Sequence, residues 1–235
     1  MNQRAERRGV SAIFIQGTRY ALDFAGNGNV NIGNDASVQI TGDQTIEFWY
    51  RTNNGGGTRR NPLNKAYGGE GTITEEDGSS DNLFSYYYGT AGSNSSPYQG
   101  FKTNTNRSDV TVGRWYHVAL VRDLQNRTLT WYLNGEVDAS ASADYSSANS
   151  SGNNLQLGNG YTSRWDGAMR EFRLWSVARS QKEIQARMNT RMTGTEEGLV
   201  VYYDFQEGTG STLTDLTGNG NNGAISGPSW IEPGE

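Results

Sequence analysis

Oxygen-bearing side chains gather in the segment 215–223, and such a cluster is typical of a site for a hard metal ion. Asp215, Asn219 and Asn222 stand there among glycines. Calcium takes about six to eight oxygen ligands from carboxylates, amides and carbonyls, so a structural ion needs no histidine or cysteine. A turn in which Asp215 caps local backbone amides explains the same residues equally well. The segment therefore predicts either a calcium site or a self-capped turn.

A second acidic group occupies the segment 75–81, which contains Glu75, Glu76, Asp77 and Asp81. A glycine within the segment permits a sharp bend, so these carboxylates could converge on a cation. Charges in loops are more often simply solvated. We expect solvated charges here and keep an ion site as the alternative.

Catalytic side chains are scarce in this sequence. His117 is the only histidine, and it lies inside an alternating strand pattern, which predicts a packed, hydrogen-bonded role instead of a catalytic base. Glycoside hydrolysis needs two carboxylates about 5 to 9.5 Å apart, whereas Glu47 and Glu171 each stand alone in their segments. We therefore expect no catalytic residues and no enzymatic activity.

Large rings stand in or beside polar loops at Tyr67, Tyr98, Tyr161 and Trp165. Such rings can stack on the face of a pyranose while neighbouring amides and carboxylates bind its hydroxyls. Packing within the core or within the loops is the competing explanation for each ring. We predict that these four residues bind a ligand.

Alternation of apolar and polar residues predicts an all-β fold. In 45–51 one face is apolar and the other includes Glu47 and Arg51, so we expect one face in the core and the other in solvent. Polar loops are expected at 53–82, 90–112 and 140–154, and loops of this length commonly bind something. The clearest strands are 20–24, 45–51, 83–88, 115–122, 128–133, 168–175 and 199–205.

Two local signals define a hairpin and a helix. Asn134 and Gly135 directly follow a strand pattern and readily take the positive φ angles of a tight hairpin turn. Ser180 with Glu183 forms a capping box before the apolar Ile184, which predicts one short amphipathic helix. We expect this helix to cover an open end of a β-sandwich.

Composition excludes several classes of protein. The net charge of −5 and the absence of a lysine and arginine cluster argue against nucleic-acid binding. Without cysteine there is no disulfide framework. No apolar stretch is long enough to insert into a membrane, and no signal peptide is recognisable.

Seven segments, taken in order, resemble the laminin G-like jelly rolls of the concanavalin A-like superfamily. They are ALDFAG at 21–26, TIEFW at 45–49, WYHVA at 115–119, LTWYLNG at 129–135, EFRLW at 171–175, GLVVYYDF at 198–205 and DLTGNGNNG at 215–223. The resemblance implies a two-sheet antiparallel jelly-roll sandwich with one short helix near 180–189. It also implies a structural calcium ion at the aspartate of the last segment, although Ala25 and Arg170 replace acidic residues of the family pattern.

The last segment usually opens such a module, but here it closes the chain. The segment ending near Trp230 should therefore lie beside the strand that begins near Tyr20. Alternatively, Gly198 begins a truncated second module. We expect an arm at 1–19, which could add a strand, and one domain at 20–231.

The resemblance favours a non-catalytic, extracellular or surface-associated module that binds carbohydrate through loops at the sandwich rim. A structural or adhesion module that binds a cell-surface or extracellular protein is the first alternative. A glycan hydrolase or lyase is the second, since the superfamily hosts all these functions.

Overall fold

The computed structural model describes residues 20–78 and 82–234, and these residues form two antiparallel sheets of eight strands each. In the first, sheet A, the strand order is β10-β9-β8-β3-β12-β1-β16, and β13 also pairs with β12. Its strands are β1 (Ala21–Asp23), β3 (Gln44–Thr52), β8 (Trp115–Asp123), β9 (Thr128–Leu133), β10 (Glu136–Ser142), β12 (Gly167–Trp175), β13 (Leu199–Tyr203) and β16 (Ser229–Ile231).

The second sheet, sheet B, has the order β14-β15-β2-β11-β4-β5-β6-β7. Its strands are β2 (Asn29–Gly33), β4 (Arg60–Ala66), β5 (Gly71–Glu75), β6 (Phe84–Gly89), β7 (Tyr98–Lys102), β11 (Leu155–Leu157), β14 (Thr212–Leu213) and β15 (Gly223–Ser226). Helix α1 spans Gln181–Arg187, and two 3-10 helices span Ala36–Val38 and Arg107–Asp109. The predicted arm at 1–19 lies outside the described residues.

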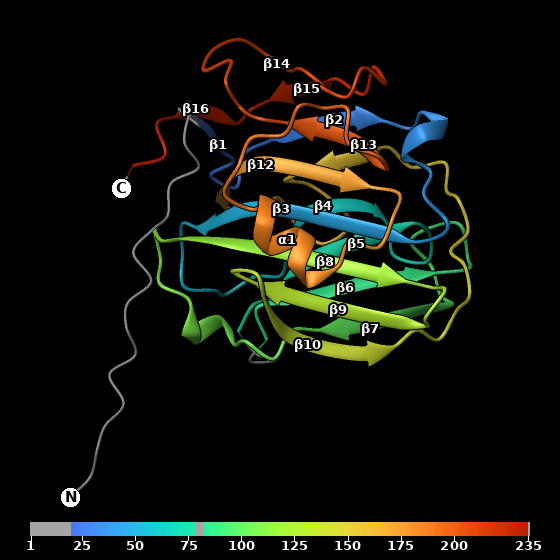
Figure 1. The fold of residues 1–235 in the computed structure, drawn as a ribbon. Coiled ribbons are helices and arrows are strands. Elements are labelled where there is room, and N and C mark those ends of the chain that lie inside the picture. The colour runs from blue at the N-terminus through green and yellow to red at the C-terminus, as the bar shows by residue number, and fades with distance from the viewer. Residues whose placement is uncertain (1–19, 79–81, 235) are drawn as a thin grey trace, which may run out of the picture.

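The two sheets lie face to face and enclose one large apolar core (Figure 1). Large rings fill the space between them, and Tyr50, Phe84 and Trp131 are fully buried there. The ring of Phe84 contacts both others, with centroids 4.9 Å from Tyr50 and 5.9 Å from Trp131. The predicted all-β, two-sheet antiparallel sandwich is thus confirmed.

The segment after Gly198 completes both sheets. Strand β13 pairs with β12, and β15 pairs with β2 in the opposite sheet. Strand β16 pairs with β1, where Trp230 lies opposite Leu22. The predicted contact between the strand near Tyr20 and the segment near Trp230 is confirmed.

The local signals in the sequence also form as predicted. Asn134 and Gly135 connect β9 to β10 with φ angles of 52° and 79°. Ser180 caps α1, its hydroxyl accepts from the Glu183 backbone N–H, and the Glu183 carboxylate accepts from the Ser180 N–H. These signals succeed because each depends on only a few neighbouring residues.

The expectation that α1 covers an open end of the sandwich is wrong, because the helix lies across the outer face of sheet A (Figure 1). Buried Ile184 packs there against residues of β8 and β9. The Trp49 indole donates to the carbonyl of Met188, which follows the helix. The outer face of β3 is therefore largely buried instead of wet, and the side chain of Glu47 is only 2% exposed.

Three strands lie inside the segments predicted as loops. Strands β4 and β5 lie within 53–82, and β7 lies within 90–112. Strand β4 reads RNPLNKA and β7 reads YQGFK, so neither shows a simple apolar alternation. Their pairing in sheet B supplies the order that their own sequences do not indicate.

A buried polar network joins β3, β8 and β12 beneath α1. Glu47 lies 3.3 Å from His117 Nε2 and 3.8 Å from an Arg173 nitrogen, and its Oε1 accepts from the Trp175 indole at 2.9 Å. Burial opposes ionisation of Glu47, but His117, Arg173 and Trp175 together outweigh it and lower the pKa of Glu47 to about 2. Burial is also the main reason that the pKa of His117 lies below its usual value. His117 is therefore a packed core histidine, as predicted.

Replacement Glu47→Gln should make the protein less stable at neutral pH and less sensitive to acid. The folded pKa of about 2 lies below the ordinary value of 4.5, so this stabilisation is present above pH 4.5 and is lost as pH falls toward 2. The lost stability at pH 7 is about 3 kcal/mol. Urea unfolding at pH 7, 4.5 and 3 measures it, with exposed Glu197→Gln as control. Parallel stability curves for wild type and Glu47→Gln would contradict this assignment.

Candidate functional site

The outer face of sheet B carries a surface groove. Along each strand alternate side chains point to opposite faces. Tyr86 and Tyr88 on β6 enter the core and Tyr87 points outward. On β11, Leu155 enters the core and Gln156 points outward. The outward residues of β4, β6 and β11 thus meet in one groove.

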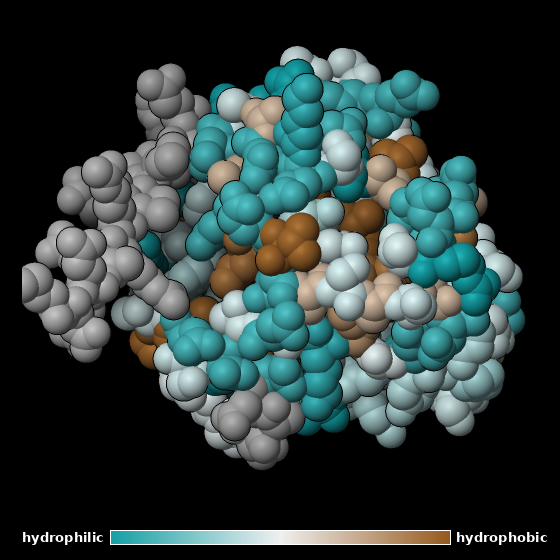
Figure 2. Space-filling view, turned by 60° about the horizontal axis from the view of Figure 1, so that its bottom comes forward, coloured by the Kyte–Doolittle hydropathy of each residue, from teal (hydrophilic) through white to brown (hydrophobic). Residues whose placement is uncertain are grey.

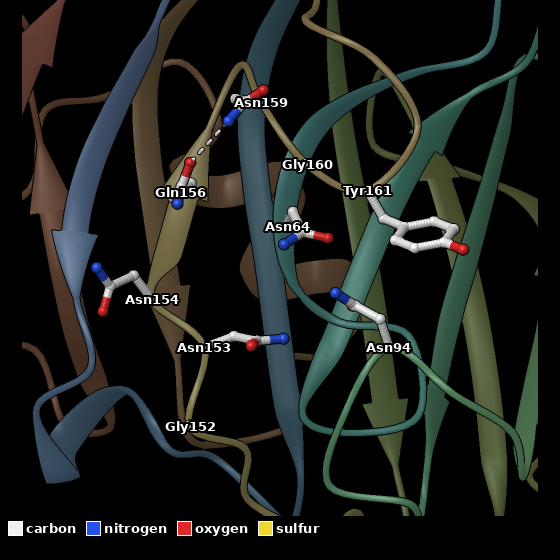
Figure 3. A pocket seen from close by; sticks show the side chains of 9 residues that line it. All are labelled: Asn64, Asn94, Gly152, Asn153, Asn154, Gln156, Asn159, Gly160 and Tyr161. Atoms are coloured by element: carbon white, nitrogen blue, oxygen red, sulfur yellow. Dashed lines mark hydrogen bonds between the residues drawn. The ribbon is translucent and has the colours of Figure 1, made fainter.

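One half of the groove, which we call the amide trough, has a volume of about 440 Å³. Figure 3 shows amide side chains from β4, from β11 and from the loops on either side pointing into it. A volume of this size is usual for a small-molecule site. The lining residues are Asn64, Asn94, Gly152, Asn153, Asn154, Gln156, Asn159, Gly160 and Tyr161.

Several of these amides have hydrogen-bonding groups to offer. The Gln156 Oε1 accepts from Asn29 Nδ2 and Asn159 Nδ2, each at 3.1 Å, which orients the Gln156 amide nitrogen. Within residues 20–78 and 82–234, no hydrogen bond holds the side chains of Asn153 and Asn154. Each free amide group can both donate and accept.

The other half is a cluster of four rings, the tyrosine cluster, formed by Tyr67, Tyr87, Tyr98 and Tyr161. Ring centroids lie 4.8 Å apart for Tyr67 and Tyr87, and 5.6 Å apart for Tyr87 and Tyr98. Tyr67 also contacts Tyr98 at 6.1 Å and Tyr161 at 5.8 Å. A cavity of about 110 Å³ lies among these rings and is also lined by Arg59, Asn94 and Thr162. Because Asn94 and Tyr161 line both cavities, the two halves are continuous.

Tyr67 contacts the exposed rings of Tyr98 and Tyr161 and helps to hold them in place. Its side chain is largely buried, and its hydroxyl is hydrogen-bonded by the Asn61 amide at 3.2 Å and lies 2.9 Å from the Thr74 hydroxyl. Its backbone N–H donates to Asn94 Oδ1 at 3.2 Å. Around this fixed ring, Tyr98 is 42% exposed and Tyr161 is 72% exposed.

Gly100 on β7 makes room for the tyrosine cluster. A Cβ atom at this position would lie 3.0 Å from a ring carbon of Tyr87, so a larger residue would displace that ring. Burial raises the pKa of Tyr87, whose hydroxyl accepts from Arg59 at 2.9 Å. Tyr87 thus remains a neutral ring at physiological pH.

A buried ion pair under sheet B fixes the loop that borders the amide trough. Lys65 Nζ lies 3.6 Å from Glu70 Oε1 and donates to the backbone carbonyl of Asn153 at 2.6 Å. Glu70 accepts from the backbone N–H and the hydroxyl of Ser151. The charges therefore point inward and hold the loop, while the neutral amides of the loop face the groove.

The structure brings together three of the four rings predicted to bind a ligand, namely Tyr67, Tyr98 and Tyr161. The prediction that Trp165 binds a ligand is wrong, because its ring is not exposed. Trp165 is fully buried, its ring lies 5.1 Å from that of Phe24, and its indole donates to Glu75 at 2.8 Å. Trp165, two residues before β12, turns inward because its large ring closes the core, so no face is available to a ligand.

Most groove residues were missed in the sequence. The amides of the trough come from β4, β11 and three loops, and only their density around 153–161 is visible in the sequence. Tyr87 lies within the predicted strand 83–88 and is not among the residues predicted to bind a ligand. The groove also lies on a sheet face with its bordering loops, whereas rim loops were expected.

The loop at 215–223 forms the self-capped turn. The Asp215 carboxylate accepts from the backbone N–H groups of Tyr202, Thr217 and Asn221 and from the Thr217 hydroxyl. Asn222 Oδ1 accepts from the Asp215 N–H, and Asn219 donates through its amide nitrogen. The hydrogen bonds of Asp215 and Asn222 thus account for the turn without an ion, and a calcium ion at Asp215, Asn219 and Asn222 stays a prediction.

The acidic segment at 75–81 is divided between two ion pairs. Glu75 is buried in the core, where it pairs with Arg107 and accepts from the Tyr50 hydroxyl. Glu76 pairs with Arg59 at 2.9 Å. Asp81 lies outside the described residues. Glu75 and Glu76 thus meet arginines instead of solvent, and in the described part of the chain no three His, Cys, Asp or Glu side chains are grouped to hold a metal.

The comparisons with known proteins agree with this fold. The family profile described as "Concanavalin A-like lectin/glucanases superfamily", a laminin G-like profile, matches residues 24–185. The chain therefore belongs to this laminin G-like family. A search of curated proteins found no match.

Several solved structures share this fold. A candidate carbohydrate-binding protein from Bacteroides ovatus aligns at a TM-score of 0.71 with 20% identity, over 92% of this chain and 60% of its own. A pentraxin from Limulus polyphemus aligns at 0.51 with 13% identity, over 72% of this chain and 81% of its own. A structure of botulinum neurotoxin type C aligns at 0.50 with 12% identity, over 63% of this chain and 36% of its own. The chain thus spans 60% of the Bacteroides protein, and at these identities the likeness establishes the fold.

Replacement Asp215→Asn should destabilise the protein by about 1–3 kcal/mol, because an amide nitrogen would then face backbone donors. We expect the same loss in calcium and in chelator, since the carboxylate holds the loop by hydrogen bonds. Urea unfolding of wild type and variant under both conditions measures it. A wild-type melting temperature that rises with calcium, with the rise absent in Asp215→Asn, would instead indicate a calcium site.

Proposed function

We propose that this chain is a non-catalytic carbohydrate-binding module that holds a glycan in the groove on the outer face of sheet B. The observation that carries this proposal is the convergence of free amide groups beside exposed tyrosine rings, of which Figure 3 shows Tyr161. Sugar hydroxyls both donate and accept hydrogen bonds, as amides do. A pyranose also presents an apolar C–H face that packs against aromatic rings.

The family and its structural relatives support a binding role. The Bacteroides protein is described as a candidate carbohydrate-binding protein, and the description of the neurotoxin structure refers to two ganglioside molecules. In the groove of the present chain, the lining side chains include one arginine and no carboxylate. A hydrolase would need an acid and a base beside the scissile bond, so binding without cleavage accounts better for this lining.

The exposed surface offers little for a protein-binding alternative. Interfaces with proteins usually centre on a contiguous apolar patch. Figure 2 brings the β7 and β10 side of the sandwich forward and shows a largely hydrophilic surface with hydrophobic side chains near its centre and in separate spots toward its edges. In the described residues the exposed large hydrophobics are Tyr98, Val112, Val137, Tyr161 and Leu216, and both tyrosines belong to the groove.

Replacements Tyr161→Ala and Asn154→Ala should each weaken glycan binding about tenfold, because each removes one contact worth about 1–2 kcal/mol. Both side chains are exposed, so stability should change little. A glycan array identifies bound sugars, and calorimetry on the best oligosaccharide measures the affinity of each variant.

Val137→Ala and Asn126→Ala serve as matched controls, since both residues are exposed and neither lines the groove. Control variants should bind as wild type does. If the array stays blank, or if the groove variants bind as well as the controls, the proposed function is wrong.

A further inference from the structure

The groove differs from the rest of the surface in its charge. Of the residues lining the amide trough, none is an aspartate, glutamate, lysine or arginine. The cavity of the tyrosine cluster has one charged lining residue, Arg59. The chain as a whole carries 45 charged side chains, so a continuous groove with a single charge is a distinct feature.

That one charge is already compensated. Arg59 Nε lies 2.9 Å from Glu76 Oε2, and a second nitrogen lies 3.3 Å from Glu76 Oε1 and 2.9 Å from the Tyr87 hydroxyl. The Glu76 side chain is 5% exposed, whereas that of Arg59 is 39% exposed. A carboxylate that approached Arg59 would therefore also meet the nearby, poorly solvated charge of Glu76.

A second cation beside the groove, Lys65, is also compensated. Lys65 lies on β4 next to Asn64, but its amine is buried beneath the sheet, 3.6 Å from Glu70 and bonded to the Asn153 carbonyl. Its side chain is 2% exposed, so it offers no charge to a ligand in the trough. Neither cation is therefore available to offset the free-energy cost of desolvating the carboxylate of an acidic sugar.

The amides themselves favour hydroxyls over carboxylates. Gln156 Oε1 already accepts two hydrogen bonds, while the side chains of Asn153 and Asn154 offer carbonyl oxygens as well as N–H groups. A hydroxyl can use both kinds of group, but a carboxylate can only accept. A carboxylate in the trough would leave amide oxygens unsatisfied or facing its negative charge.

We propose that the groove selects uncharged oligosaccharides of at least two sugar units and rejects their acidic counterparts, an inference that rests on the proposed function. One sugar occupies the amide trough, where hydroxyls meet the amides. The next sugar packs in the tyrosine cluster, since Asn94 and Tyr161 border both cavities. The Glu76 charge then acts as a specificity determinant, because it keeps Arg59 from binding an anion.

Paired ligands test this selectivity directly. Cellohexaose, laminarihexaose and mannohexaose are each compared with the form oxidised at C6, in which uronate carboxylates replace primary hydroxyls. Calorimetry with wild type should show at least about tenfold weaker binding for the oxidised member of a pair that binds, the size of one charged group desolvated without a partner. The matching monosaccharides should bind more weakly than the hexasaccharides, because they fill one cavity.

Replacement Glu76→Gln tests the role of the ion pair. It leaves Arg59 uncompensated, so affinity for the oxidised hexasaccharide should rise about tenfold, as expected for a charge-assisted hydrogen bond. Affinity for the neutral parent should stay within about twofold. Glu197→Gln changes the net charge equally at an exposed site away from the groove and should leave both affinities unchanged.

Selectivity is overturned if an oxidised hexasaccharide binds wild type as tightly as its neutral parent and loses that binding in Tyr161→Ala. A folded Glu76→Gln protein with no gain for the oxidised form overturns the role of Glu76. If Glu76→Gln does not fold, the selectivity is judged from the affinities of wild type for the neutral and oxidised hexasaccharides. Absence of binding to both members of every pair, and to the array, is instead the failure of the proposed function.

Discussion

The constraint on which this protein depends is the alternation of side chains across the strands of sheet B. Each inward residue of β4, β6 and β11 must pack in the sandwich core, and this places its neighbour on the outer face. Burial of Tyr86 and Tyr88 therefore sets Tyr87 in the groove, and burial of Leu155 does the same for Gln156. The core packing and the candidate site are two sides of one sheet.

The two outer faces of the sandwich differ in how far they are covered and in the charge of their side chains. Helix α1 covers sheet A, where Glu47, His117 and Arg173 form a buried charged network that no ligand can reach. Sheet B has no such helix over the groove among the described residues, and most of the side chains that line this groove are amides and tyrosines. Buried charged groups therefore stabilise the outer face of sheet A, while neutral polar groups on the outer face of sheet B are available to bind a ligand.

The ion pairs nearest the groove hold its bordering loop and Arg59 in place and leave the groove lining nearly uncharged. Lys65 and Glu70 hold the loop at 151–153 from beneath the sheet. Arg59 is held by Glu76 beside the tyrosine cluster. Because both cations are paired within the protein, the rigid framework is charged while the lining remains nearly neutral. This separation suits a site that binds hydroxyls, and a family fold that hosts many functions can acquire it through few residues.

The sequence by itself determined the all-β class, the hairpin at Asn134 and the capped helix at Ser180, because alternation and short-range signals lie within single segments. The resemblance to laminin G-like jelly rolls, through the order of its segments, implied the contact between the segments near Tyr20 and Trp230. The sequence also identified three rings of the tyrosine cluster, because aromatic residues in polar loops stand out by type alone.

Only the tertiary structure decided which groups meet. Strand β4 contains polar residues and a proline, so it shows no apolar alternation, and its place between β11 and β5 comes from long-range pairing. Exposure could not be read from residue type, since Trp165 and Glu75 are core residues whereas Tyr161 is exposed. The amide trough joins segments about 90 residues apart, such as Asn64 and Gln156. Such convergence depends on strand pairing between distant segments, which local patterns do not encode.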